Sequence, residues 1–393
     1  MNKQPDKKTD KKQNTKARLY RNRTIKIVSL ILALAVTVLF LQEFILCNPN
    51  HNSERVRGYY LEDENSLDVI VVGSSEVYCC YSAGLAYQEC GFTSYPYATE
   101  GNTVRNFKTI FDEIRRTQTP KLIVFEINGA IYGDKNIDKE VNLRRVSDNM
   151  PLNDNKVELV EKGATSDQIE YYVPFIKYHG AWDTLYNTIG WSISLIQDKL
   201  RGYNLLKGIK NRTQIFVPDS KVYSTSELQK RRPLFRKSDE ELNDFLQYLV
   251  DEGYDSEKIL FIRVPHITTD VNITRYQRGN SIADTIRRYG FNFVSFESDD
   301  PEIGIDVNKD FYNIEHMNVY GLQKFSKFFA HYLQDNYNIG PSELTEEQKE
   351  EWDKTGPYYE AYVKYNEQLF SEGKDIEVAE NYPCMREINK LVQ

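Results

Sequence analysis

A run of β-branched residues that stops at a serine-containing turn constrains the fold of this chain most. Residues Val69 to Val72 read Val-Ile-Val-Val, which is typical of a strand buried on both faces of a parallel sheet. The run stops at Gly73, and residues 76–90 have a pattern that favours a helix. Ser75 is therefore expected at a strand-to-helix turn, where the first N–H groups of the helix point outward without intrahelical partners.

A serine at such a turn has two interpretations. It suits a nucleophile, because the start of a helix stabilises negative charge that develops beside it. It also suits a helix cap, because serine is among the residues preferred at that position, and Ser74 or Ser75 can take this role. The turn alone does not decide between the two.

Four further apolar segments repeat the strand pattern, and helical patterns separate most of them. The predicted strands are residues 93–97, 122–127, 259–264 and 291–296; the predicted helices are 104–116, 238–251, 273–289 and 319–337. This alternation predicts an α/β fold with a parallel sheet and helices on both faces. Ligands of such sheets bind beyond the carboxyl ends of the strands. Ser75, Gly101 and Asn128 follow three strand ends, which predicts a site there.

Two segments depart from this alternation. Residues 133–237 contain helical pieces and turns but no regular pattern, and we interpret them as an inserted cap within an α/β domain of residues 67–340. Residues 341–393 are acidic and rich in tyrosine, and we interpret them as a helical C-terminal appendage.

The N-terminus is strongly basic and is followed by an apolar run. Residues 1–26 contain ten Lys or Arg and two Asp, a charge of +8, so the rest of a chain of net charge −8 carries −16. Residues 27–46 are long and apolar enough to cross a bilayer. No small-x-small cleavage pattern follows them, and the bulky Leu46 before Cys47 does not fit a lipidation signal. We therefore expect an uncleaved transmembrane anchor.

The charge asymmetry predicts the orientation of this anchor. By the positive-inside rule, residues 1–26 form a cytoplasmic tail, and the body lies outside a single-pass cell-membrane anchor. Residues 47–66 are then a polar stalk. A basic tail is also compatible with nucleic-acid binding, but the adjoining anchor argues against that partner.

The chain shows no pattern of a disulfide framework or of a bound metal. Its cysteines are few and odd in number: Cys47, Cys79, Cys80, Cys90 and Cys384. It lacks a Cys-x-x-Cys or His-x-x-x-His pair, so we expect no metal site. The Gly-Ser-Ser turn also lacks the Gly-x-Gly-x-x-Gly fingerprint of a dinucleotide site, and we expect no cofactor.

A histidine near the end of the predicted domain occupies a position that mirrors Ser75. His316 precedes the last predicted helix, 319–337. Together with Gly73-Ser74-Ser75, Gly101, Asn128 and the run Asn313 to Gly321, it gives a sequence that resembles the SGNH/GDSL hydrolases. It resembles their membrane-anchored Gram-positive branch of hydrolases and acyltransferases, and it is distantly similar to the teichoic-acid D-alanyl transfer proteins. The resemblance covers residues 67–337 and implies a three-layer α/β/α fold.

The resemblance implies a role for each motif residue. Ser75 matches the nucleophile and His316 its general base. The backbone N–H groups of Ser75 and Gly101, with the Asn128 side chain, match the oxyanion donors. The match at Asn128 departs from the family pattern, because Glu126-Ile127-Asn128-Gly129 replaces Gly-x-Asn-Asp. Plain turn chemistry explains Gly101 and Asn128 equally well.

The position of the family's catalytic acid, three residues before the histidine, is occupied by Asn313. In a serine-protease triad the same Asp→Asn change lowers kcat by roughly 10⁴, because the wrong imidazole tautomer is favoured. Three alternatives follow. Asp310 or another carboxylate substitutes, a Ser–His dyad suffices, or the protein no longer catalyses. Asp310 also fits a solvated loop charge.

Polar and aromatic clusters in the inserted cap are candidates for substrate binding. Arg144 and Arg145 suit an anionic group, and His179 and Trp182 suit a sugar. The alternative is a packing patch between domains with Trp182 buried.

Two classes of function remain. The first is an extracytoplasmic serine acyl-esterase or O-acyltransferase that acts on a cell-envelope glycopolymer. The second is a catalytically weakened SGNH-like binding or assembly subunit of an envelope polysaccharide system. The expected partner in both is a cell-envelope polysaccharide or teichoic-acid-like polymer, and a membrane-embedded protein partner is compatible with either.

Overall fold

Five parallel strands form the centre of the body. They are β1 (Val69–Gly73), β2 (Ser94–Ala98), β3 (Leu122–Glu126), β4 (Ile259–Arg263) and β5 (Asn292–Ser295). Their order in the sheet is β2-β1-β3-β4-β5, and every pairing is parallel. The computed structural model describes residues 7–373 and residue 388. Within them, the five strands predicted from apolar runs all form, within two residues of the predicted bounds.

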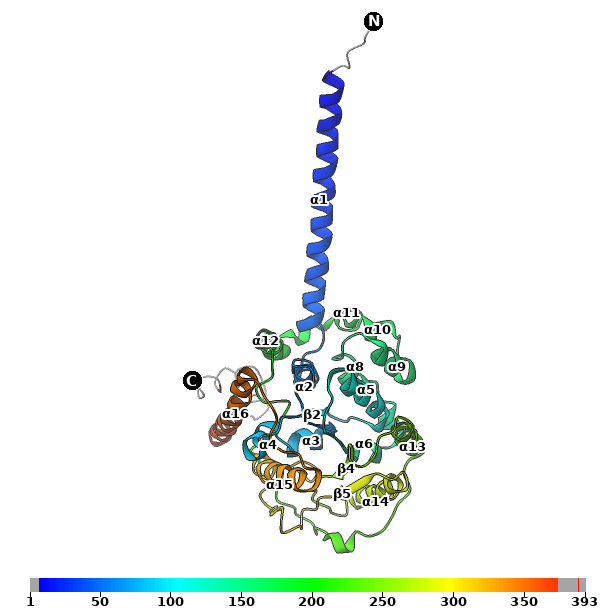
Figure 1. Ribbon diagram of the computed structural model, residues 1–393, viewed down its shortest axis with the longest axis vertical. Coiled ribbons are helices and arrows are strands. Elements are labelled where there is room, and N and C mark those ends of the chain that lie inside the picture. Colours follow the sequence, from blue (N-terminus) through cyan, green and yellow to red (C-terminus); the bar gives the residue numbers. More distant parts are fainter. Residues whose placement is uncertain (1–6, 374–387, 389–393) are drawn as a thin grey trace.

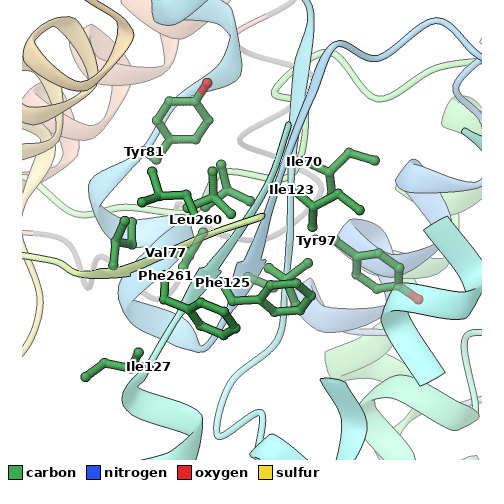
Figure 2. Close-up of a cluster of buried hydrophobic side chains, with 14 of the residues drawn as sticks. Ile70, Val77, Tyr81, Tyr97, Ile123, Phe125, Ile127, Leu260 and Phe261 are labelled. Carbon is green, nitrogen blue, oxygen red and sulfur yellow. The ribbon is translucent and has the colours of Figure 1, made fainter. Parts of the chain in front are cut away.

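Helices cover both faces of this sheet, which explains why the strands are apolar throughout. Every residue of β1 to β4 is buried. On one face, Phe125 of β3 stacks on Phe261 of β4 with ring centroids 5.6 Å apart, beneath α5 (Phe107–Thr117) and α13 (Arg236–Asp251). Figure 2 shows Val77 and Tyr81 of the first crossover on the opposite side of the strands. There α3 (Ser75–Cys80) and α4 (Ala83–Cys90) pack against α15 (Val319–Tyr337).

Several helix boundaries differ from the predicted ones for local reasons. The helix expected over 76–90 is two helices, because Ser82 caps α4 by accepting the N–H of Leu85. The helix expected from Ser238 begins at Arg236 as α13, and the Ser238 hydroxyl instead donates to the carbonyl of Tyr132 at 2.5 Å. The helix expected over 104–116 begins instead with a short 3-10 turn (Val104–Asn106), and α5 follows it directly.

Residues 47–66 are not a polar stalk, and the expectation of one was wrong. Residues His51–Tyr59 form α2, which packs on β2 with most of its side chains buried. The Arg55 side chain is only 2% exposed; it donates to the carbonyl of Ala98 at 3.2 Å and lies 3.6 Å over the Tyr78 ring. Polar residues that satisfy one another inside the body cannot be distinguished from a solvated spacer by composition.

The inserted region between β3 and β4 is mostly helical up to Arg201, whereas residues 202–235 form only one short 3-10 turn, Thr225–Glu227. Its helices are α6 (Asn128–Ile131), α7 (Asp134–Ile137), α8 (Glu140–Ser147), α9 (Asp154–Gly163), α10 (Ile169–Tyr172), α11 (Pro174–Tyr178) and α12 (Leu185–Arg201). Figure 1 shows α8 to α12 at the end of the body nearest the N-terminal helix. Beyond β4, α14 (Ile273–Arg288) leads to β5, and Asn318 caps α15 through the N–H groups of Tyr320 and Gly321.

The two ends of the chain are helical where they are described. The N-terminal helix α1 spans Lys7–Phe44, and its part Arg18–Phe44 is long and apolar enough to cross a membrane. Near the C-terminus, Thr345 and Gln348 form a capping box at the start of α16 (Glu346–Ser371), which packs on α4. The predicted appendage beyond residue 373, including Cys384, lies outside the described residues except for the buried Ile388. The other four cysteines are buried free thiols.

The stacked aromatic pair at the sheet centre makes a stability prediction. Replacing the fully buried Phe125 by Ala should lower the free energy of unfolding by about 3–5 kcal/mol, because the cavity adds to the lost transfer energy. Phe370→Ala on α16, where the ring is 54% exposed, is the matched control and should change it by less than about 0.5 kcal/mol. Urea unfolding followed by tryptophan fluorescence measures both. Equal effects of the two substitutions would contradict this account of the core.

Candidate active site

The structure brings Ser75 and His316 together although 241 positions separate them in the sequence. Ser75 is the first residue of α3, directly after the end of β1. His316 lies in the loop that leads from β5 to α15. Its Nε2 is 2.8 Å from the Ser75 Oγ, a distance typical of a nucleophile and its general base.

Ser74 and Ser75 take different positions in the turn, which separates the helix cap from the candidate nucleophile. The Ser74 Oγ accepts the N–H of Glu76 at 3.4 Å, so Ser74 caps α3. The same hydroxyl donates to Glu126 Oε2 at 3.1 Å, and Ser74 is fully buried. Ser75 takes no part in the cap, which leaves its hydroxyl directed at His316.

Asn313 contacts the other ring nitrogen of His316. Its Oδ1 lies 3.0 Å from His316 Nδ1 and also accepts the backbone N–H groups of Glu315 at 2.8 Å and His316 at 2.9 Å. Because two backbone donors converge on this atom, it is the amide oxygen and not the nitrogen. The oxygen requires a proton on Nδ1, so Nε2 is the acceptor that faces Ser75. This is the tautomer that a general base needs, and Asn313 lacks only the negative charge of an acid.

Asp310 does not lie at the histidine. Its carboxylate accepts the backbone N–H of Asp306 at 2.7 Å and the ammonium of Lys324 at 2.6 Å. Its backbone carbonyl accepts the N–H of Asn318, the residue that caps α15. Asp310 therefore stabilises the loop that carries His316 and is neither a substitute acid nor a solvated loop charge, since it is 2% exposed.

The surroundings of His316 keep its ring neutral. The ring stacks on Tyr312 with centroids 5.4 Å apart and planes only 9° apart. Burial is the main cause that lowers the pKa of His316 to about 4, although the nearby Glu76 carboxylate opposes this shift. An imidazole with this pKa is ready to accept a proton at neutral pH, but it is a weaker base than an ordinary histidine.

Two backbone N–H groups at the cavity have no acceptor within the described chain. The N–H of Ser75 is the first of α3 and has no intrahelical acceptor. Gly101 lines the cavity that holds Ser75, and within the described chain nothing accepts its N–H. Its φ of +62° favours glycine, and a Cβ there would lie 2.8 Å from Asn142 Oδ1. Neither N–H group is used by the fold, so both are available to a ligand.

Asn128 lies behind Ser75 and outside this cavity. Its side-chain amide donates to Glu76 Oε1 at 2.5 Å and to the Tyr132 hydroxyl at 3.3 Å. Only 6% of the residue is exposed, and it does not line the cavity that holds Ser75. In this structure the amide is committed to Glu76 and does not point at a substrate, unlike the predicted third oxyanion donor.

A buried group of acids and a histidine supports the turn from behind, and sequence reasoning missed it. Glu76 Oε2 lies 2.5 Å from His266 Nε2. Burial opposes a charge on His266, but the Glu76 carboxylate outweighs burial and raises the pKa of this imidazole. Burial, followed by the charge of Glu76, raises the pKa of Glu126 to about 8. The signals in the sequence were Glu76 directly after the serines and His266 two residues after the predicted strand 259–264.

The cavity at Ser75 and His316 has a volume of about 760 Å³ and polar and aromatic walls. Besides the residues already named, its lining includes His51 of α2, Tyr78 of α3, Glu100, Lys139, Arg145 of α8, Trp191 of α12 and Arg212. His51, Tyr78 and Trp191 had no signal in the sequence, because the fold of the inserted region and of α2 brings them here. A cavity of this size accommodates one or two sugar rings.

The structure separates the four residues predicted to bind substrate. Arg145 lines the cavity, where its guanidinium donates to Glu100 Oε2 at 2.7 Å. Arg144 is buried outside it, among Glu140, Asp148 and the Tyr171 ring, as the packing alternative expects. His179 and Trp182 do not line this cavity, and Trp182 is 54% exposed instead of buried.

Comparisons with known proteins add no assignment. No model of a protein family matches this chain, and no curated protein matches it. The family resemblance therefore rests on the motifs alone.

The low pKa of His316 makes a prediction about pH. Reaction of Ser75 with a fluorophosphonate needs the neutral imidazole of His316. The labelling rate should therefore stay constant at pH values above the pKa of His316 and fall as the pH drops through about 4. The measurement is the labelling rate of the full-length protein in detergent between pH 3 and pH 8, with tryptophan emission as the check of folding. His316→Ala should label slowly with no such midpoint. A midpoint at or above the ordinary histidine pKa of about 6.5 would contradict the burial argument.

Proposed function

We propose that this protein is an extracytoplasmic serine acyl-transfer enzyme, an esterase or an O-acyltransferase, that acts on a cell-envelope glycopolymer. The single observation that carries the proposal is the 2.8 Å contact between Ser75 Oγ and His316 Nε2, with Asn313 Oδ1 on the other ring nitrogen. A helix cap or a local hydrogen bond of the histidine does not require the Ser75 contact, which joins residues 241 positions apart. That contact is the one that activates a hydroxyl, and the Asn313 contact orients the base.

The proposed first step forms an ester on Ser75. The Ser75 Oγ attacks the acyl carbonyl carbon of an ester while its proton moves to His316 Nε2. The carbonyl oxygen becomes an oxyanion and accepts the N–H groups of Ser75 and Gly101, which stabilise it. The tetrahedral intermediate then collapses, the bond to the leaving alcohol oxygen breaks, and this oxygen takes the proton from Nε2.

The second step releases the acyl group and distinguishes an esterase from a transferase. A water or a sugar hydroxyl enters the position of the leaving alcohol and gives its proton to Nε2 as it attacks the acyl carbon. The Ser75 oxygen leaves and recovers that proton. Throughout, Asn313 holds the Nδ1 proton in place, and its neutral amide stabilises the imidazolium by a hydrogen bond but not by charge.

The substrate class is supported by the lining of the cavity and by the N-terminal helix. Aromatic faces such as those of Tyr78 and Trp191 suit sugar rings. The apolar Arg18–Phe44 segment is suited to hold the body at a membrane, and the +8 charge of residues 1–26 favours the body outside. A tether of this kind raises the effective concentration of an enzyme beside envelope polymers.

One observation favours a second candidate, a binding or assembly subunit of an envelope polysaccharide system with weakened catalysis. Among the described residues, no carboxylate contacts Nδ1 of His316, so an imidazolium there has no directly hydrogen-bonded negative charge. The cavity would then hold a polymer segment without turning it over. The two predictions below separate this candidate from the enzyme.

The first prediction concerns the nucleophile. In full-length protein in detergent, a fluorophosphonate should attach to Ser75, as mass spectrometry of the peptide identifies. Ser75→Ala should lose the label and reduce acyl release from activated esters by roughly 10³-fold or more. Ser226→Ala, at an exposed serine outside the cavity, is the control and should behave as wild type. Folded wild-type protein that never labels at Ser75 would favour the binding subunit.

The second prediction concerns the missing charge. Asn313→Asp should raise kcat tenfold or more, about 1.4 kcal/mol of barrier, because a carboxylate keeps the three N–H contacts and stabilises the imidazolium. It should also raise the pKa of His316 and move the acid limb of the rate to higher pH. The measurement is Ser75-dependent release of an acyl group across pH.

Asp310→Asn is the control for this substitution. It removes the ion pair with Lys324 and should lower stability without raising kcat. If wild type and Asn313→Asp both show no Ser75-dependent acyl release or transfer, the enzyme proposal fails.

A further inference from the structure

Helix α12 exposes an apolar stripe to its surroundings. The residues recur every three or four positions and so share one face: Trp182 just before the helix, then Tyr186, Ile189, Ile193, Ile196 and Leu200. Tyr186 is 89% exposed, Leu200 83% and Ile189 50%. We call these six residues the α12 stripe.

The inner face of the same helix is only partly apolar. Ser194, Leu195 and Asp198 are each at most 4% exposed. The Ser194 hydroxyl donates to the buried Glu54 at 2.9 Å, and Asp198 accepts the side-chain amide of Asn204 at 2.7 Å. The most exposed side chains of the α12 stripe are thus apolar, although polar groups are buried on the other face. This distribution predicts that the outer face meets something apolar.

The position of α12 in the fold indicates what its outer face contacts. Both α11 and α12 contact α1, and Figure 1 shows them on either side of the point where α1 meets the body. In this view α12 is seen nearly end-on, whereas α1 lies along the page, so α12 crosses the direction of α1. Exposed Ile176 of α11 lies on the same end of the body, and the exposed Lys199 at the end of α12 adds positive charge, whereas Lys177 is paired with Glu140 and Glu170.

We propose that the α12 stripe lies in the headgroup region of the bilayer that α1 crosses, in the leaflet on the side of the body. A helix with one apolar face and cations beside it lies in the plane of the interface, and Trp and Tyr are enriched at this depth. The body then contacts the membrane directly through α12 and is not held there by α1 alone. This docking is independent of any chemistry at Ser75.

The choice of lipid over a protein partner rests on the link to α1. The span Arg18–Phe44 ends at Phe44, where α1 contacts the body, so the surface of the bilayer lies at the level of α11 and α12. Any exposed apolar residue at this level meets lipid before it meets a partner. Trp191, on the same helix, lines the Ser75 cavity, so docking of α12 also sets the height of this cavity above the membrane.

The test uses a fluorescent label at single cysteines of the full-length protein in lipid nanodiscs. Ile189→Cys places an NBD label on the α12 stripe, and Val271→Cys places it on an equally apolar residue, 81% exposed, next to α14. Leu34→Cys in α1 is the positive control for the span. Cys384 is replaced by serine, and the other native cysteines are buried. The discs contain phosphatidylcholine and phosphatidylglycerol with ordinary or brominated acyl chains.

Brominated lipid should lower the fluorescence of the NBD label at position 189 by about twofold, as at position 34. It should leave the fluorescence of the label at position 271 unchanged. Adding Ile193→Glu should reduce the quenching at 189, because a charge in the stripe weakens its insertion. Quenching at 34 with none at 189 would overturn the proposal. If the label at position 189 is shielded from water in native membranes but not in lipid discs, the stripe contacts a membrane protein and not lipid. Fluorophosphonate labelling of the same samples reports separately on Ser75.

Discussion

The buried carboxylate of Glu126 ties together the two strand ends on which the site depends. It lies at the end of β3 and accepts both the N–H and the hydroxyl of Ser74 at the end of β1. It also accepts the N–H of Asn128, which begins α6. This approach needs a glycine beside it, because a Cβ on Gly73 would lie 2.8 Å from the Cβ of Glu126. The turn that presents Ser75 is therefore held by hydrogen bonds to Glu126 on the neighbouring strand. Because β1 and β3 pair in parallel, these hydrogen bonds lie at the carboxyl edge of the sheet.

The strands and the position of Ser75 were predictable for a physical reason. Strands buried on both faces need continuous apolar runs, and a site at their carboxyl ends collects the residues that follow each run. His316 lies 21 residues after the end of β5, and its place before the last predicted helix and the family resemblance indicated it instead. The cavity walls were not predictable in this way. Polar residues of α2 were interpreted as a spacer because composition does not reveal that Arg55 is satisfied by a carbonyl inside the fold. Trp182 was interpreted as buried or substrate-binding, because a helix with its apolar face outward has the same periodicity as one with it inward.

Asn313 shows how geometry and charge contribute separately to a histidine base. An asparagine whose amide is free to turn can present its NH₂ group and favour the wrong tautomer. Here the backbone N–H groups of Glu315 and His316 hold the amide oxygen toward the ring, so orientation is preserved without charge. The sequence shows only that the acid is missing. The direction of the amide depends on the turn between β5 and α15, which no residue pattern specified.

The burial of α2 connects α1 to the cavity through a very short stretch of chain. Only six residues separate Phe44 at the end of α1 from His51, which lines the cavity beside Trp191. A cut in the chain between these points would release the body with all walls of the cavity in place. A chain that began at Leu67, where the first strand pattern starts, would lose His51 and the helix that covers β2. Release of an intact body by a single cut is thus confined to a window of a few residues after α1.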